Sequence, residues 1–288
     1  MPPMTPILAR KMWRTLEPYH GLVYFTPRAT EAYAALGITG QAGYFASRAA
    51  AMGPVPAEVV IATFYNFDPA LVRAAIPAAW RSAAPAAVAA ARLGAIDLAL
   101  RDVLGDDALS SDDMRSAAEL ARRATEGCPP EGRPLAASHA ALPWPDEPHL
   151  VLWHAITVLR EFRGDGHVAA LVTEGIDGCE ALVTHGAAGD DPVSLDVLRV
   201  TRGWSDDAWD AARERLRARG WLDGDDGLTA EGTAVRDRVE AVTDERALAP
   251  WLVLGADDCD RLRGLVRTWS KAIAASDAFT GAAARRPG

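Results

Sequence analysis

Two segments of the chain gather histidine, charged and aromatic side chains that could carry acid–base chemistry or hold an organic ligand. In the first, Glu17, His20 and Tyr24 are three and four residues apart and share one face if this stretch is helical. Imidazole exchanges protons near neutral pH, and a nearby carboxylate can orient it. We predict His20 as a catalytic residue and Glu17 and Tyr24 as ligand-binding residues. The alternative is an aromatic core that contains a buried polar network.

Arg48 follows Tyr44 and Phe45 and is predicted to bind the same ligand. Its planar guanidinium can grip a carboxylate or a phosphate through two parallel hydrogen bonds. The same geometry would equally close an ion pair within the protein, so both roles stay open.

The second segment lies between two predicted helices, 148–162 and 166–174. Within eight residues it holds Arg160, Glu161, Arg163, Asp165 and His167. We predict His167 as a second catalytic residue that faces an interior pocket, with its charge set by Asp165 or Glu161. Arg163 and Asp165 are predicted ligand-binding residues, although Asp165 is also expected to cap the helix that contains His167. The alternative for His167 is a structural histidine.

The other histidines do not show the spacing of a metal site. His154 follows Trp153 and is predicted to line the ligand pocket, whereas His139 and His149 fall in a proline-rich stretch and are expected to be exposed. No two histidines are four residues apart, so we predict no metal. Signatures for phosphate loops, dinucleotides, zinc proteases and serine hydrolases are absent, which leaves enzymatic activity open and names no cofactor.

Helices must position these side chains, because alanine-rich and leucine-rich segments with charges at helical spacing dominate the chain. Ser111 and Ser205 each precede two aspartates, a pattern typical of helix starts. Short strands are expected only near residues 221–222 and 228–229. The expected helices cover 6–16, 26–36, 40–51, 56–65, 69–75, 84–103, 111–126, 148–162, 166–174, 178–185, 194–201, 205–219, 229–248 and 257–275.

Proline and glycine interrupt the helical pattern once, which divides the chain into two halves. We predict an N-terminal helical half over 1–127, a linker over 128–147, a C-terminal half over 148–279 and a flexible tail over 280–288.

An internal repeat relates the two halves. When the chain is shifted by 138 residues, residues 37–75 align with 175–213 without a gap and share 12 of 39 positions. The pattern of short helices and tight glycine turns is typical of a helix-turn-helix unit. We therefore predict a mainly α fold in which tandem helix-turn-helix or winged-helix units form a single-chain pseudo-dimer. The alternative is a chance similarity between alanine-rich helices.

The second copy continues into a winged-helix pattern. A helix over 205–219 is followed by Gly220-Trp221-Leu222, an aspartate-rich and glycine-rich turn over 223–227, and Leu228-Thr229-Ala230-Glu231-Gly232. This order resembles the recognition helix and wing of MarR-like regulators.

More closely, the chain resembles an actinobacterial SalK-like family labelled helix-turn-helix. The resemblance is carried by segments 17–20, 24–27, 44–48, 159–167, 202–205 and 243–244. It implies a fold and a bacterial lineage, and no settled activity.

Charge argues against the DNA binding that this label suggests. Residues 201–250 hold 8 basic and 12 acidic side chains, and the wing carries three aspartates that phosphate would repel. The whole chain of 288 residues has a formal net charge of −9, unlike a general nucleic-acid binder.

The class of function follows from these observations. Our leading hypothesis is a protein that binds a small organic molecule between the two copies, with catalysis left open. The alternatives are a ligand-responsive MarR-like regulator, for which DNA binding is not excluded, and a protein-interaction module. Three scattered cysteines fit a reducing cytoplasm, no apolar run suits a membrane, and a homodimer stays open.

Overall fold

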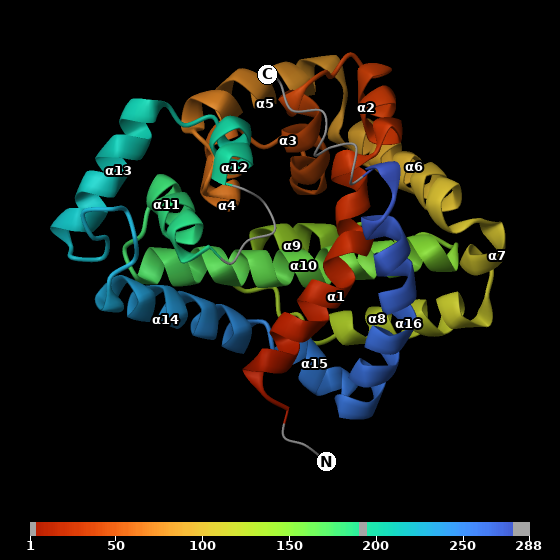
Figure 1. The fold of residues 1–288 in the computed structure, drawn as a ribbon. Helices are drawn as coiled ribbons and strands as arrows, with labels where there is room; N and C mark the ends of the chain where they lie inside the picture. Colours follow the sequence, from red (N-terminus) through yellow and green to blue (C-terminus); the bar gives the residue numbers. More distant parts are fainter. Residues whose placement is uncertain (1–3, 190–194, 279–288) are drawn as a thin grey trace.

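The computed structural model describes residues 4–189 and 195–278, and it confirms the mainly α prediction (Figure 1). The helices before residue 127 are α1 (Pro6–Phe25), α2 (Pro27–Ala34), α3 (Gln41–Ala49), the 3-10 turn η1 (Ala50–Met52), α4 (Ala57–Phe64), α5 (Pro69–Ser82), α6 (Pro85–Leu104), α7 (Asp106–Leu109) and α8 (Asp112–Thr125). The later helices are α9 (Pro134–Ala140), α10 (Pro148–Thr173), α11 (Gly178–Ala188), α12 (Leu195–Arg202), α13 (Asp206–Ala218), α14 (Ala230–Arg246), α15 (Ala249–Leu254) and α16 (Ala256–Ala274).

Helix α10 runs through the middle of the molecule and most of its residues are buried (Figure 1). The prediction of two helices over this stretch is wrong, because α10 continues without a break past Gly164 and Gly166. A Cβ at Gly166 would collide with the guanidinium of Arg133, which crosses α10 there and donates to the Phe162 carbonyl oxygen at 2.6 Å. The glycine therefore permits a close approach and does not end the helix.

The predicted linker contains a helix that packs on α10. Leu135 and Ala136 of α9 are buried, and so is His139, at 3% exposure. His149 at the start of α10 is equally enclosed, with Nε2 2.6 Å from Asp97 Oδ1. The prediction that these two histidines are exposed is wrong, since proline here starts helices that pack into the core.

Helix starts follow the predicted capping chemistry. The hydroxyl of Ser111 accepts from the backbone N–H of Met114, and the hydroxyl of Ser205 accepts from that of Ala208. Both serines thereby satisfy an N–H group that a helix start leaves without a partner.

Helices α3, α4 and α5 correspond to α11, α12 and α13 under the shift of 138 residues. The shift carries the bounds of α4 onto those of α12, and it carries the start of α5 to within one residue of the start of α13. The two sets touch through the turns before α5 and α13: Asp68 N–H donates to Arg202 O at 2.9 Å, and Trp204 Nε1 donates to Asn66 O at 3.0 Å. The aligned residues 192 and 193, and the predicted tail over 280–288, lie outside the described residues.

The wing is minimal. An isolated antiparallel bridge joins Leu222 and Leu228, and no sheet forms in residues 4–189 or 195–278. Within the same ranges, no helix is by itself both long and apolar enough to cross a membrane; only α5 and α6 together, bent by 96°, pass that test.

Candidate functional site

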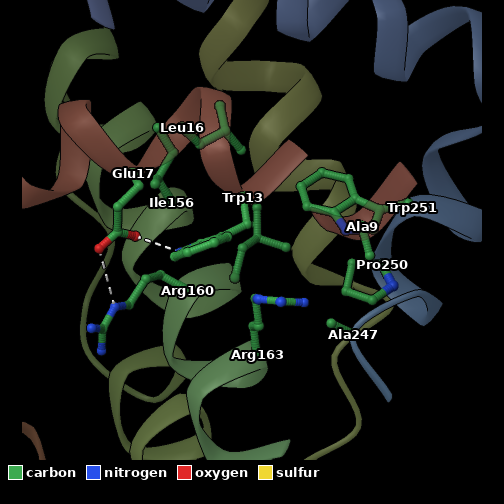
Figure 2. Close-up of a pocket in the computed structure, with 11 residues that line it drawn as sticks. Ala9, Trp13, Leu16, Glu17, Ile156, Arg160, Arg163, Ala247, Pro250 and Trp251 are labelled. Atoms are coloured by element: carbon green, nitrogen blue, oxygen red, sulfur yellow. Dashed lines mark hydrogen bonds and ion pairs between the residues drawn. The ribbon is translucent and has the colours of Figure 1, made fainter. Parts of the chain in front are cut away.

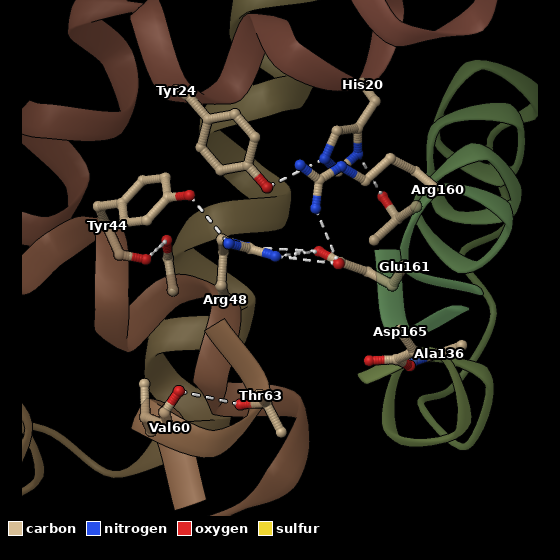
Figure 3. A network of polar contacts seen from close by, with 12 residues as sticks. His20, Tyr24, Tyr44, Arg48, Val60, Thr63, Ala136, Arg160, Glu161 and Asp165 are labelled. Atoms are coloured by element: carbon tan, nitrogen blue, oxygen red, sulfur yellow. Dashed lines mark hydrogen bonds and ion pairs between the residues drawn. The ribbon is translucent and has the colours of Figure 1, made fainter. Parts of the chain in front are cut away.

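A network of buried charges lies where α3 and α1 meet the middle of α10 (Figure 3). The side chain of Glu161 is 1% exposed and accepts from Arg48 Nη2 at 3.0 and 3.1 Å and from Arg160 Nη1 at 2.9 Å. Burial opposes ionisation of this carboxyl, but Arg48 and Arg160 hold the pKa of Glu161 well below its usual range. The network therefore contains a permanent carboxylate between two guanidinium groups.

Tyr44 adds a phenol to this network. Its hydroxyl accepts from Arg48 Nη1 at 2.9 Å. Burial alone would raise the pKa of Tyr44, but the charge of Arg48 lowers it below the ordinary value. The ring of Tyr44 lies 5.3 Å from that of Tyr24. Tyr44 is the more acidic of these two phenols, because burial raises the pKa of Tyr24 to about 12.

A chain of hydrogen bonds links Arg92 on α6 to the interior of α10 through Tyr24 and His20. Arg92 Nη2 lies 3.1 Å from the Tyr24 hydroxyl, which lies 3.0 Å from His20 Nε2. Continuing inward, His20 Nδ1 lies 3.1 Å from Thr157 Oγ1, and that hydroxyl donates to the Trp153 carbonyl oxygen at 2.9 Å.

Thr157 fixes the direction of this chain, because its only hydroxyl proton goes to the Trp153 carbonyl oxygen and it must therefore accept from His20 Nδ1. In a neutral ring, Nε2 of His20 then accepts from the Tyr24 hydroxyl, which in turn accepts from Arg92. Burial lowers the pKa of His20 well below its usual range and raises that of Tyr24 to about 12, so both are neutral near pH 7. The arrangement is an ordered chain of neutral hydrogen-bonding groups that ends at a cation, and the pKa values of Tyr24 and His20 are too far apart to favour proton transfer between them.

The network reaches the surface at Glu17 and Arg160, whose side chains are 31% and 26% exposed. Arg160 Nε lies 3.7 Å from Glu17 Oε1, and Glu17 Oε2 accepts from Trp13 Nε1 at 2.9 Å. Burial raises the pKa of Glu17 above its ordinary value. Figure 2 shows this group at one side of a small cavity of about 20 Å³, with Trp251 at the other side. That volume holds about one water molecule.

The predicted residues His167 and Arg163 belong to a second network at the other end of α10. His167 Nδ1 lies 3.0 Å from Thr243 Oγ1 on α14, and Arg163 Nη1 lies 2.7 Å from Asp244 Oδ1. Thr157, the partner of His20, precedes His167 by ten residues, which is about 15 Å along a helix. The two predicted catalytic histidines therefore do not act on one bond.

Asp165 caps a helix, but not the one expected. Its Oδ2 accepts from the backbone N–H of Ala136 at 3.0 Å, at the start of α9. The prediction that it caps the helix containing His167 is wrong, because α10 has no start there. Burial raises the pKa of Asp165 to about 6.

The structure brings together Glu17, His20, Tyr24 and Arg48 of the predicted site, while His154 on α10 packs its ring 4.6 Å from that of Trp144. The sequence analysis missed Arg92, Tyr44, His139 and Thr157. One signal was available for Arg92: it is a single charge in an otherwise apolar, alanine-rich stretch of α6.

The arginines of α13, which corresponds to a recognition helix, and Arg219 directly after it pair with carboxylates. Arg215 pairs with Asp177 at 2.6 Å and Glu180 at 2.8 Å, and Arg219 pairs with Glu180 at 2.5 Å. The other two, Arg213 and Arg217, pair with Asp226 of the wing. These arginines thus already have carboxylate partners, Asp226 and Glu180, with which the phosphates of DNA would have to compete.

The starts of α5 and α13 lie close together. Asp68, which directly precedes α5, is hydrogen-bonded to Arg202, four residues before α13 begins. Four residues span at most about 14 Å, and with the hydrogen bond and the flanking backbone the two helices begin within about 25 Å of each other. Recognition helices of a dimer on DNA are about 34 Å apart.

Comparison with known proteins gives a match at the level of the family. The model of a family described as the helix-turn-helix family matches residues 9–280. No curated protein and no solved structure matches the chain.

Proposed function

Since the chain belongs to this helix-turn-helix family, we propose that it is a SalK-like, MarR-related protein in which two fused copies bind a small organic molecule instead of reading DNA. The ligand enters beside α10 where Glu17 and Arg160 reach the surface, and because the cavity there holds about one water molecule, binding requires the side chains around it to move apart.

The common bounds of α4 and α12 under one shift support an internal duplication. Asn66 and Trp204 differ by the same 138 residues and are in contact, as are equivalent residues close to a two-fold axis. A single-chain pseudo-dimer accounts for both observations.

Two features weigh against DNA. Phosphate binding relies on arginines that are free to exchange counterions, and those of α13 are already paired with acids. The close starts of α5 and α13 also do not suit half-sites one helical turn apart.

One observation carries the ligand proposal: the charges buried around Glu161 come from both halves of the chain. Arg48 lies in the first half, and Arg160 and Glu161 lie in the second. Buried ions cost more desolvation energy than they commonly return, and perturbed groups of this kind gather at binding and catalytic sites. The Tyr24 hydroxyl, held between Arg92 and His20, adds an oriented polar group to this site.

The test is a calorimetric screen of small organic molecules against the full chain and a Tyr24→Phe variant. Tyr19→Phe is the matched control, because Tyr19 is also a buried tyrosine of α1 whose hydroxyl donates elsewhere, to the His149 carbonyl oxygen. We expect a binder whose affinity falls at least tenfold in Tyr24→Phe and is retained in Tyr19→Phe. Equal loss in both variants, or no binder in a broad screen, would contradict the proposal.

A second arm measures the anisotropy of a labelled 30-base-pair duplex at low salt. We expect no binding. Binding that weakens steeply with salt would instead favour the regulator hypothesis.

A further inference from the structure

We propose that the molecule bound in this interior carries an anionic group, a carboxylate or a phosphate, and that Arg92 is its counter-ion. This inference rests on the proposed function and names the chemical class of the ligand.

Arg92 is a buried cation without a carboxylate partner. It is 3% exposed, and among residues 4–189 and 195–278 no carboxylate oxygen lies within 4.0 Å of it. Its two terminal nitrogens donate to neutral acceptors, the Ser47 carbonyl oxygen at 3.4 Å and the Tyr24 hydroxyl at 3.1 Å. Its Nε has no hydrogen-bond partner. A cation in this setting is strongly disfavoured unless an anion joins it.

Aromatic faces give Arg92 only partial compensation. The guanidinium carbon lies 4.9 Å from the centre of the Trp153 ring and 5.8 Å from that of Tyr24. Such contacts are weaker than an ion pair with a buried carboxylate. They leave Nε of Arg92, which has no hydrogen-bond partner, as the donor that an anion would engage.

Two histidines whose pKa values respond to the charge of Arg92 each have one ring nitrogen without a hydrogen-bond partner. His139 on α9 and His154 on α10 are 3% and 5% exposed, and the Nε2 atom of each has no hydrogen-bond partner. Burial and the charge of Arg92 lower the pKa of His139 to about 3 and that of His154 to about 4. Both rings are therefore neutral, and each can donate one N–H to an anion held by Arg92.

The placement of the buried carboxylates agrees with this inference. Arg48 and Arg160 share Glu161, whereas no carboxylate of the described residues pairs with Arg92. A ligand with one negative group would give Arg92 the ion-pair partner that the described residues do not.

The experiment uses the full chain and simple probes: benzoate, phenyl phosphate, inorganic phosphate and the neutral analogue benzamide. Thermal unfolding and calorimetry report binding, and NMR of ring-labelled histidine reports His139 and His154. We expect an organic anion to raise the melting temperature and to shift both histidine signals, with benzamide at least tenfold weaker. Preference for benzoate or for phenyl phosphate distinguishes a carboxylate ligand from a phosphate ligand.

Arg92→Met should abolish the anion response, and Arg81→Met, at an exposed arginine of α5, should keep it. Without any anion, Arg92→Met should also melt at a higher temperature than the unmodified chain, because an unpaired buried cation has been removed. This second readout tests the inference even if no probe fits the site.

Three outcomes would overturn the inference: an anion response that survives in Arg92→Met, a marked fall in its melting temperature without anion, or a failure of every anion to act on the unmodified chain. A neutral molecule that binds in a Tyr24-dependent and Arg92-independent manner would overturn this inference and leave the proposed function intact.

Discussion

At the scale of single residues, Glu161 is the carboxylate that compensates the charges of the buried Arg48 and its neighbour Arg160. Glu161→Gln keeps the shape of the side chain but leaves Arg48 and Arg160 without their shared carboxylate. We expect a loss of about 3 kcal/mol in the free energy of unfolding, because an uncompensated buried charge remains. Urea unfolding followed by circular dichroism measures it.

The control for this prediction is Glu58→Gln, which breaks the exposed pair with Arg73. Surface pairs contribute less than about 1 kcal/mol, so this variant should resemble the unmodified chain. Similar losses of unfolding free energy in the two variants would show that Glu161 contributes no more to stability than an exposed carboxylate does.

The buried histidines predict a fall in stability at mildly acid pH. The pKa of His154 is about 4 in the folded chain and 6.5 when unfolded, so the unfolded chain binds more protons as the pH falls below 6.5. Acid therefore favours unfolding, by about 2 kcal/mol for each such histidine between pH 6.5 and pH 5. His139, with a pKa of about 3, adds a similar amount.

Asp165 opposes this trend in part, because its pKa of about 6 in the folded chain exceeds the ordinary 3.8 and its protonation favours folding. Urea unfolding at pH 6.5 and pH 5 tests the net effect. The unmodified chain should lose stability, and His154→Gln should lose about 2 kcal/mol less. If His154→Gln lost as much stability between pH 6.5 and pH 5 as the unmodified chain, His154 would bind protons equally well in the folded and the unfolded chain.

Sequence reasoning identified residues of the site where local spacing was informative. Glu17, His20 and Tyr24 follow each other on one helical face, and the structure places them in one network. Arg92 and His139 could not be found in this way. Their role depends on which side of α6 and α9 meets α10, and that is decided by packing between segments far apart in the sequence.

At the scale of elements, Gly178 sets how closely the start of α11 approaches the turn after α4. A Cβ at this first position of α11 would collide with the carbonyl oxygen of Tyr65, just past the end of α4. Gly178→Ala should therefore cost about 2 kcal/mol in the free energy of unfolding, since backbone cannot move aside cheaply. Chemical denaturation provides the measurement.

Gly94→Ala is the matched change, because Gly94 lies on the open side of α6 with nothing within 4 Å of a new Cβ. It should gain about 0.5–1 kcal/mol from the better helix propensity of alanine. If Gly178→Ala were stabilised to the same degree, the start of α11 would not be in tight contact with the turn after α4.

Helix starts were predicted correctly where a capping serine marks them, whereas a helix break was predicted wrongly where glycine lies inside a continuous helix. Ser111 and Ser205 start helices as expected. Gly164 and Gly166 suggested a break in α10, but tertiary packing against Arg133 overrides the weak helix propensity of glycine.

At the scale of the whole molecule, α10 ties the predicted halves together. Its Glu161 pairs with Arg48 of the first half, and its Arg163 pairs with Asp244 of α14, which Arg10 of the first half also contacts at 2.8 Å. Separation of the halves would take Arg48 from Glu161 and Arg10 from Asp244, so both buried carboxylates would lose a partner. The boundary predicted at 128–147 therefore does not imply independent stability of the two sides.

We accordingly expect one cooperative unfolding transition. Urea curves recorded by tryptophan fluorescence, for which Trp80 lies on α5 and Trp209 on α13, should coincide with those recorded by far-ultraviolet circular dichroism. Single-tryptophan variants that keep either Trp80 or Trp209 should share one midpoint. Two midpoints would instead show that the helices α3–α5 and α11–α13 unfold separately, and the buried network would then be a contact between two domains rather than part of one core.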